Sequence, residues 1–330
     1  MNVAVVILNW NGKHLLEEYL PEVIKHSRQA SIYVVDNAST DDSISYVSSK
    51  FPTVKLIKLD DNYGYAGGYN RAVKQINMPI QILMNNDIRP TKNWLQPIIS
   101  SFEKNRNIAA LQPKLLSDKN KQYFDYAGAG GGFIDHLGYP FCRGRLFNDI
   151  EKDEGQYDDE VEIFWASGAC LAIRKEVFEI AGGFDELYFA HQEEIDLCWR
   201  INNLGYKIRV VPTSKVYHLG GGTLDEQHPK KTFYNFRNSL FNLLKNAPQE
   251  HFKQRILIRM LLDGLAFLQY MSLLKWHHAV MIFCAHIDFY KFYSSIIQKR
   301  KGYHNTTYFR AKSLVIQYFL LGRKAFSKIN

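Results

Sequence analysis

The feature of this sequence that most constrains its fold is a regular alternation of short apolar runs with segments of helical periodicity. Residues 3–8 (VAVVIL) form a continuous, mostly β-branched run, which is typical of a strand buried on both faces of a parallel sheet. Between Gly12 and Ser27, apolar residues recur at helical spacing, which predicts a helix with one apolar stripe packed on that sheet. The chain therefore begins as a β-α unit.

The same alternation continues for about 200 residues. Further strands are expected at residues 32–35, 54–59, 80–84, 162–165, 170–173, 207–211 and 214–217, and helices at 66–76, 94–102, 175–181 and 193–204. A Gly-rich, aromatic stretch at residues 126–144 is typical of loops and short strands around a binding site. Together these elements predict an α/β fold with a doubly wound, mostly parallel sheet, in which ligands bind beyond the carboxyl ends of the strands.

The pattern changes near Pro229, after which the strands stop and the chain is helical in periodicity. We therefore expect an α/β domain at residues 1–228 and a helical region at residues 229–330. The most apolar stretches of that region, residues 264–274 and 279–287, are each shorter than the ~20 residues that cross a bilayer, so amphipathic helices are predicted.

The formal net charge of +8 favours an anionic partner, which is a nucleoside diphosphate, an acidic membrane surface or a nucleic acid. Cations interspersed among aromatic residues in the helical region predict contact with an anionic membrane; the alternative is a packing or homo-oligomerisation unit with a solvated basic face. No nucleic-acid recognition motif accompanies the charge, so nucleic acid is not an expected partner. These cations are Arg255, Arg259, Lys275, Lys291, Lys299, Arg300, Lys301, Arg310, Lys312, Arg323 and Lys324.

The cysteines and the N-terminal residues indicate the cellular compartment. Cys142, Cys170, Cys198 and Cys284 are far apart and form no CxxC pair, which indicates a reducing compartment. The first ten residues lack a basic segment and a cleavage site and predict a strand instead. A cytoplasmic protein is expected. If the helices contact lipid, it is expected to be peripheral on the cytoplasmic face of the inner membrane.

Polar side chains directly follow three of the expected strands. They are Asn9 and Asn11, then Asp36 and Asn37, then Asn85, Asn86 and Asp87. Because the carboxyl ends of parallel strands share one edge, Asp36 and Asp87 are expected to face the same crevice. Asp36 would accept hydrogen bonds from a base or ribose, and Asp87 would offer a hard oxygen ligand to Mg²⁺ or Mn²⁺ on a diphosphate. The alternative for Asp36 and Asn37 is an Asx-turn that leads into the next helix.

A glycine-rich segment opens the third expected helix. Gly64, Gly67 and Asn70 belong to this segment (NYGYAGGYNR, residues 62–71), whose backbone amides would approach a phosphate or sugar. The segment does not match the GxGxxG fingerprint, and no such fingerprint follows the first strand, which argues against a dehydrogenase.

Seven motifs in this order resemble family 2 glycosyltransferases of the GT-A fold, in the branch that includes rhamnosyltransferase-like enzymes. They are VVILNWNG, VVDNASTDDS, NYGYAGGYNRA, LMNNDI, ASGACLAIRKEVFEIAGGFDE, HQEEIDLCWR and VYHLGGGTL, spread over about residues 3–225. The resemblance implies a Rossmann-like sheet and a metal-dependent, inverting hexosyl transfer from a nucleotide-sugar of the dTDP-rhamnose or UDP-hexose type. The implied acceptor is a hydroxyl of a cell-envelope glycan or of its lipid-linked precursor.

The resemblance also implies roles for individual residues. Asp36 matches the nucleoside-binding aspartate, and Asn85-Asn86-Asp87 occupies the DxD position, with Asp87 as metal ligand and a neutral amide in the first place. Glu194 matches the catalytic base, where aspartate is usual, and Glu193 and Asp196 are the alternatives. Carboxylates in a first helical turn are also favoured by the helix dipole without any catalysis.

Four further residues have two interpretations each. His218 follows the expected strand 214–217. It either binds the metal or the diphosphate, or it is a packed or capping residue. Residues 219–223, which come after it, are expected to form a flexible loop able to close over a ligand. Trp165, Ser167 and Gly168 form either a wall of the donor or acceptor site or a turn before a strand.

Two other functions remain open at this point. One is a catalytically silent scaffold that binds a nucleotide-sugar or a partner, which the departures at Asn85 and Glu194 suggest. The other is a nucleotidyltransferase, which uses similar strand-end aspartates.

Overall fold

The structure is a computed structural model of the chain, and it describes residues 1–220, 228–302 and 307–329. Its centre is an eight-stranded sheet in the order β3-β2-β1-β4-β11-β6-β12-β5. These strands are β1 Val3–Asn9, β2 Ser31–Asp36, β3 Lys55–Lys58, β4 Ile80–Asn85, β5 Ile88–Pro90, β6 Ile108–Ser117, β11 Cys170–Arg174 and β12 Lys207–His218.

Most strands of the large sheet run in one direction. β1 pairs in parallel with β2 and β4, β2 with β3, and β6 with β12; β11 is antiparallel to β4 and β6, and β5 is antiparallel to β12. The register places Asn9 opposite Asp36 and Leu8 opposite Asn85. The expected α/β fold with a mostly parallel sheet is therefore confirmed, and the polar strand ends lie along one edge.

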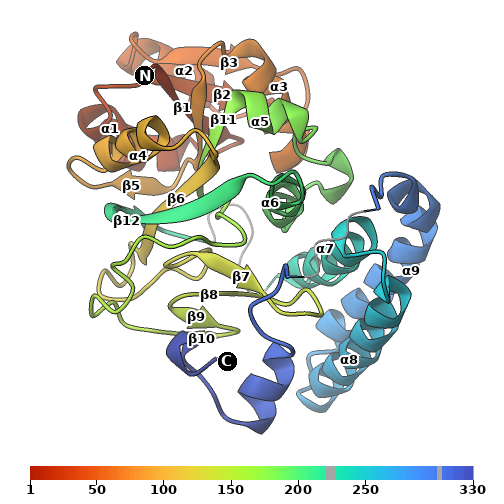
Figure 1. Cartoon of the computed structure of the whole chain (residues 1–330). Helices are drawn as coiled ribbons and strands as arrows, with labels where there is room; N and C mark the ends of the chain where they lie inside the picture. The colour runs from red at the N-terminus through yellow and green to blue at the C-terminus, as the bar shows by residue number, and fades with distance from the viewer. Residues whose placement is uncertain (221–227, 303–306, 330) are drawn as a thin grey trace.

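Helices cover both faces of this sheet (Figure 1). On one face, α1 (Lys13–His26), α2 (Ser43–Lys50) and α4 (Leu95–Lys104) contribute apolar side chains such as Leu16, Leu20 and Ile98 to one core cluster. On the other face, α3 (Gly64–Gln75), α5 (Lys175–Ile180) and α6 (Glu193–Asn203) contribute to a second cluster.

The glycine-rich stretch near residue 130 forms a small antiparallel sheet, as its composition predicts. It consists of β7 Gly132–Ile134, β8 Pro140–Cys142, β9 Arg145–Leu146 and β10 Asp149–Ile150. Phe141 and Leu146 of this sheet pack against Leu314 and Ile329 near the C-terminus. The end of the chain thus returns to the α/β part of the molecule (Figure 1).

Three expected strands differ in the structure. Residues 162–165 pair only at isolated positions, Glu162 with Arg209 and Trp165 with Gly132, so the expected strand there is wrong. The segments expected at 207–211 and 214–217 form one strand, β12, with an irregularity between Val211 and Lys215.

The described part of the C-terminal region contains three α-helices, α7 (Pro229–Asn246), α8 (Phe252–Ser272) and α9 (Trp276–Gln298), and two shorter helical segments, Ile316–Leu320 and Phe326–Lys328. α7 begins at the expected boundary, but its Leu240 and Phe241 join the same core cluster as α3 and α6. The division at residue 228 stays a prediction. α9 is, by length and composition, apolar enough to cross a membrane, so the expectation that these stretches are too short is wrong for α9.

Candidate functional site

Asn9 connects the ends of three neighbouring strands. Its buried side chain accepts a hydrogen bond from Asn86 Nδ2 at 2.8 Å and donates one to Ser39 Oγ at 3.4 Å. A Cβ atom at Gly12 would collide with the side-chain amides of Asn9 and Asn86 and would displace their hydrogen bond. The Asn9 side chain therefore fixes the strand ends against each other.

Asp36 lies at the end of β2 and is almost fully buried. Its Oδ2 atom accepts a hydrogen bond from the Ser39 backbone N–H at 2.9 Å, which is the expected Asx-turn. Its Oδ1 atom is buried and has no hydrogen-bond partner among the described residues. Because a buried carboxylate oxygen without a donor costs free energy, Oδ1 is a suitable acceptor for a ligand.

Asn11 and Asn37 connect loops of the site. The Asn11 side chain accepts a hydrogen bond from Thr40 N–H at 2.7 Å, which joins the loop after β1 to the loop after β2. The Asn37 side chain donates to Asn62 Oδ1 at 2.9 Å and to the Gly64 carbonyl at 3.1 Å. These contacts show both amides supporting the loops around Asp36.

Asp87, His218 and Asp125 form a buried row beside the end of β4. His218 Nε2 lies 3.2 Å from Asp87 Oδ1, and Nδ1 lies 3.0 Å from Asp125 Oδ2. Burial alone would lower the pKa of His218, but the charges of Asp125 and Asp87 raise it well above the usual range. Burial likewise would raise the pKa of Asp87, and the charge of His218 lowers it. In the absence of another cation, the imidazolium offsets one of the two carboxylate charges, and the row keeps a net negative charge.

The same geometry suits a divalent cation. A carboxylate oxygen and an imidazole nitrogen 3.2 Å apart can share one Mg²⁺ or Mn²⁺, which would take its other ligands from a diphosphate and water. Asp125 bonds the far nitrogen of His218, an arrangement that orients histidine ligands in metal sites. Among the described residues, no group of three or more His, Cys, Asp or Glu side chains is placed to hold a metal ion.

The acid pair Glu193 and Glu194 begins α6. One carboxylate oxygen of each, Oε2, is buried without a hydrogen-bond partner among the described residues. Burial raises the pKa of Glu194 to about 7, against backbone hydrogen bonds that lower it. Burial and then the charge of Glu194 raise the pKa of Glu193 well above its usual range. A carboxylate that titrates near neutral pH suits a general base.

Asp196, the third acidic candidate, is fully paired. Its Oδ2 atom accepts from Arg200 at 2.6 Å and Lys245 at 3.0 Å, and Oδ1 accepts from Asn246 at 2.7 Å. Burial would raise the pKa of Asp196, but these two cations lower it far below the usual range. The contacts favour an anchoring role between α6 and α7 over the expected role as an alternative base.

The backbone just ahead of α6 is held in an unusual conformation. Phe189, His191 and Gln192 all have positive φ angles, 61°, 67° and 67°, which is rare for residues other than glycine. Asn238 of α7 donates to the carbonyls of Tyr188, Ala190 and His191, and Gln192 donates to Ser239 Oγ at 2.8 Å. Polar side chains of α7 thus hold the segment that presents the acid pair.

The glycine-rich start of α3 approaches this segment. The second and third amides of α3, those of Tyr65 and Ala66, point at the carbonyl of Phe189. Gly64 has φ +66°, and a Cβ there would collide with Phe189. The amides of Tyr65 and Ala66 are therefore engaged by protein, which argues against the expected phosphate role for them. Gly67 packs beside Tyr63, and Asn70 exchanges two hydrogen bonds with the backbone of Phe184.

The residues expected to wall the site are buried and internally paired. Trp165 Nε1 donates to the Phe133 carbonyl at 2.9 Å, Ser167 Oγ donates to the Ala127 carbonyl at 2.6 Å, and the Gly168 carbonyl accepts from Tyr65. These contacts favour the second interpretation, a structural turn. Asn85 is partly exposed beside His218, with 3.5 Å between Nδ2 and Nε2.

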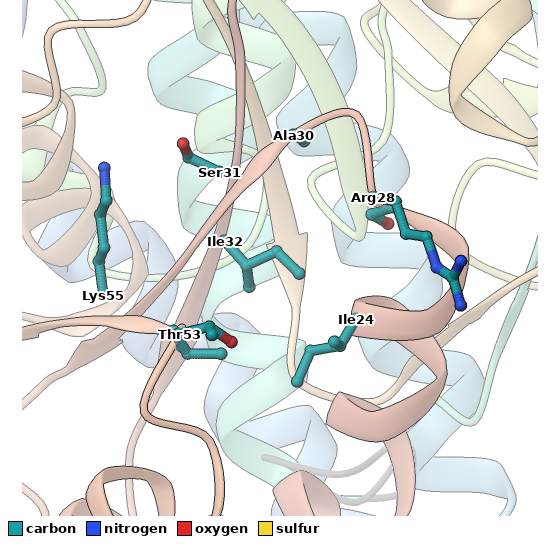
Figure 2. Close-up of a pocket in the computed structure, with 9 residues that line it drawn as sticks. Ile24, Arg28, Ala30, Ser31, Ile32, Thr53 and Lys55 are labelled. Carbon is teal, nitrogen blue, oxygen red and sulfur yellow. The ribbon is translucent and has the colours of Figure 1, made fainter.

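Of the loop expected to close over a ligand, residues 219 and 220 are described and residues 221–223 lie outside the described part of the chain. A surface pocket occupies the opposite edge of the sheet, where β2 and β3 begin. Figure 2 shows Arg28 and Lys55 on opposite sides of it. Because ligands of such sheets bind at the carboxyl ends, this pocket is not the nucleotide site.

Sequence patterns missed the residues that support the site. Asp125 stands in a Gly-rich stretch with no local sign of a partner 93 positions away. The helix α7 carries Asn238, Lys245 and Asn246, and the sequence pattern predicts that it belongs to a separate region. Only the tertiary structure brings these residues to α6 and to the segment before it.

The chain is similar to several known glycosyltransferases. The chain is 26% identical over 233 residues, 66% of its length and 75% of the relative's, to an N-acetylglucosaminyl-diphospho-decaprenol L-rhamnosyltransferase of Mycobacterium tuberculosis. It is 24% identical to the dTDP-rhamnosyl transferase RfbF of Shigella flexneri, covering 74% of this chain and 81% of the relative. A mannosyltransferase from Pyrobaculum calidifontis, in complex with GDP-Man and Mn²⁺, shares the fold with a TM-score of 0.55 at 13% identity, covering 88% and 87% of the two chains.

The family model described as glycosyl transferase family 2 matches residues 4–180, more than half of the chain. That range includes Asp36 and Asp87 and ends before the acid pair and His218. With this match and the strand-end site, the chain belongs to glycosyl transferase family 2.

Proposed function

We propose that this glycosyltransferase moves a hexose, of the dTDP-rhamnose or UDP-hexose type, to a hydroxyl of a cell-envelope glycan or its lipid-linked precursor. Both relatives described above are named as rhamnosyl transferases, and one is named for a lipid-linked diphosphate acceptor. Inversion at the anomeric carbon follows from the family resemblance.

The observation that carries the proposal is the carboxyl group of Glu194 at the start of α6, whose pKa is about 7 and whose buried Oε2 atom has no hydrogen-bond partner among the described residues. Ionised, this carboxylate accepts the proton of the acceptor hydroxyl while that oxygen bonds the anomeric carbon. One carboxylate is sufficient because the leaving diphosphate requires charge stabilisation and no proton.

The donor is held at the edge of the sheet. Asp36 would bind the nucleoside through its free Oδ1 atom, and Asp87 and His218 would hold a divalent cation. Such a cation would supply positive charge to the departing diphosphate. Asp125 keeps the far nitrogen of His218 occupied, so that Nε2 faces Asp87.

The test is nucleoside diphosphate release from dTDP-rhamnose and from UDP-hexoses, with Mn²⁺ and a lipid extract containing polyprenyl-linked acceptors. We expect release from one donor class, dependent on acceptor, and none from the Glu194→Gln variant. Pyrophosphate release from a nucleoside triphosphate would indicate a nucleotidyltransferase, and no diphosphate from any donor would indicate a binding scaffold.

A further inference from the structure

The α8 helix has its polar and apolar faces reversed relative to a soluble surface helix. Arg255, Arg259 and Asp263 are buried against the protein. On the opposite side, Leu261, Leu265 and Leu268 are each more than 60% exposed. A helix on a protein surface in water normally exposes its charged residues. The exposed apolar residues of α8 are therefore suited to an apolar partner and not to water.

The buried charges of α8 are paired inside the protein. Arg259 Nε donates to Asp263 Oδ1 at 2.9 Å, and His286 of α9 lies 3.2 Å from Asp263 Oδ2. Arg255 donates to His136 Nε2 at 2.9 Å and to the Glu250 carbonyl at 2.6 Å. The expectation that Arg255 and Arg259 meet lipid is therefore wrong, because both guanidinium groups face inward.

The neighbouring helix α9 repeats the reversed pattern. Its acidic residue Asp288 pairs with Arg237 of α7 at 2.8 Å, whereas Phe283 and Ile287 are more than half exposed. α8 and α9 pack on one another at the edge of the molecule away from the large sheet (Figure 1). Their outward sides form one apolar surface, the α8–α9 face. It comprises Leu257, Ile258, Leu261, Leu265, Leu268, Met271, Val280, Phe283, Ile287 and Tyr290.

The turn between the two helices extends this face. Leu274 is 84% exposed and Trp276 is 65% exposed, with the exposed Lys275 between them. An apolar side chain, an indole and an ammonium group side by side match the boundary between acyl chains and headgroups.

The charges beside the face decide between a membrane and a second copy of the chain. Residues 252–302 contain eight Lys or Arg and two Asp, and both aspartates are paired with cations of the protein. Lys253, Lys275, Lys291 and Lys301 are exposed. A two-fold dimer through this face would bring like charges together, whereas anionic headgroups complement them.

α9 is long enough to cross a bilayer, but its contacts favour a helix that lies on the surface. Crossing would separate Asp288 from Arg237 and His286 from Asp263, and it would carry these charges into hydrocarbon. We propose that the α8–α9 face docks on an anionic bilayer and lies in its interface, with α7 on the protein side. This proposal is independent of the donor and acceptor proposed above.

The test is co-sedimentation of the full chain with vesicles of phosphatidylcholine alone and with 30% (about one in three) phosphatidylglycerol lipids added. We expect stronger binding to the anionic vesicles, and a loss of about tenfold or more in partitioning for Leu261→Gln/Leu265→Gln, because two apolar side chains leave the interface. The matched control is Ile180→Gln/Leu204→Gln, which changes two exposed apolar residues of the α/β part and should bind as the unchanged chain does.

A second readout locates the contact. Brominated lipids should quench part of the tryptophan fluorescence, and Trp276→Phe should remove that part. Trp94, Trp165 and Trp199 are buried in the core, and the exposed Trp10 follows β1 in the α/β part, away from the α8–α9 face. Equal thermal unfolding of the variants would show that folding is intact. Binding that survives in the α8 variant, no binding to either vesicle, or a dimer in light scattering that this variant dissociates would each overturn the proposal.

Discussion

The side-chain amide of Asn238 lies 2.6 Å from the backbone carbonyl of His191, to which it donates a hydrogen bond. Asn238 is fully buried, and the same amide reaches the carbonyls of Tyr188 and Ala190. A residue of α7 thereby holds the strained segment two residues before the acid pair.

Replacing Asn238 should therefore impair the chemical step. Asn238→Ala leaves buried carbonyls without a donor, which we expect to cost about 2 kcal/mol of unfolding free energy and to lower kcat at least about tenfold. The donor KM should change little, because Asp36 and Asp87 are on other elements. Asn235→Ala is the matched control on the same helix, since the backbone carbonyl that accepts from Gln192 is retained. A rise in KM at unchanged kcat would contradict this role.

The rate should depend on the ionisation of the acid pair. Because Glu194 accepts a proton only when ionised and its pKa is about 7, kcat should rise with pH through the neutral range and level off above it. Glu193→Gln should leave the pH of this rise unchanged, because burial and not the charge of Glu193 raises the pKa of Glu194, whereas the charge of Glu194 contributes to the raised pKa of Glu193.

Glu194→Gln should lose the pH-dependent rate altogether while unfolding at a similar temperature. Full activity in that variant, with loss in Glu193→Gln, would transfer the role of base to Glu193. Steady-state rates between pH 5 and pH 9 (roughly two units either side of neutrality) make this comparison.

Asp196 should behave as an anchor. Asp196→Asn leaves the buried cation Arg200 without its carboxylate and Lys245 with Asp185 alone, and we expect a loss of about 3–5 kcal/mol in urea unfolding. Since the folded pKa of Asp196 is lowered, its stabilisation is complete above the ordinary carboxylate range and disappears as pH falls toward the folded pKa. The control is Glu162→Gln, which removes an exposed pair with Lys207 and should cost less than about 1 kcal/mol.

Asp125 should tune the proposed metal site through His218. Asp125→Asn keeps the shape but weakens the acceptor at Nδ1, so Mn²⁺ affinity should fall about 10–100-fold. Mn²⁺ titration followed by electron paramagnetic resonance, with nucleoside diphosphate present, measures this directly. Asp118→Asn, whose carboxylate pairs with Arg89, should leave the affinity unchanged, and equal affinity in Asp125→Asn would exclude the orienting role.

The strands that position the site could be predicted because their pattern is visible in consecutive residues. β1 and β4 are buried on both faces, and each ends in polar residues at the sheet edge. β6 was missed, although it is buried throughout, because Gln112, Pro113 and Lys114 interrupt its apolar pattern. Lys114 is buried only through pairing with Asp153 and Asp158, some forty positions later.

The helices after residue 228 illustrate the other limit of sequence patterns. A periodic pattern shows that α7 and α8 have two faces, and the charged face is ordinarily assigned to water. Here Asn238 and Lys245 face buried carbonyls and carboxylates, and Arg259 faces Asp263. Which face is inward depends on partners distant in sequence, so only the tertiary structure reveals it.

The core that α7 shares with the large sheet has a consequence for how the molecule unfolds. Asp196 and Asp185 both pair with Lys245, and Asp185 also pairs with Lys299 beyond the end of α9. The segment after residue 228 is thus bound to the α/β part at several sequence-distant points. Melting should be a single cooperative event for both, and a protease that cuts near residue 228 should yield a nicked complex whose two fragments remain associated.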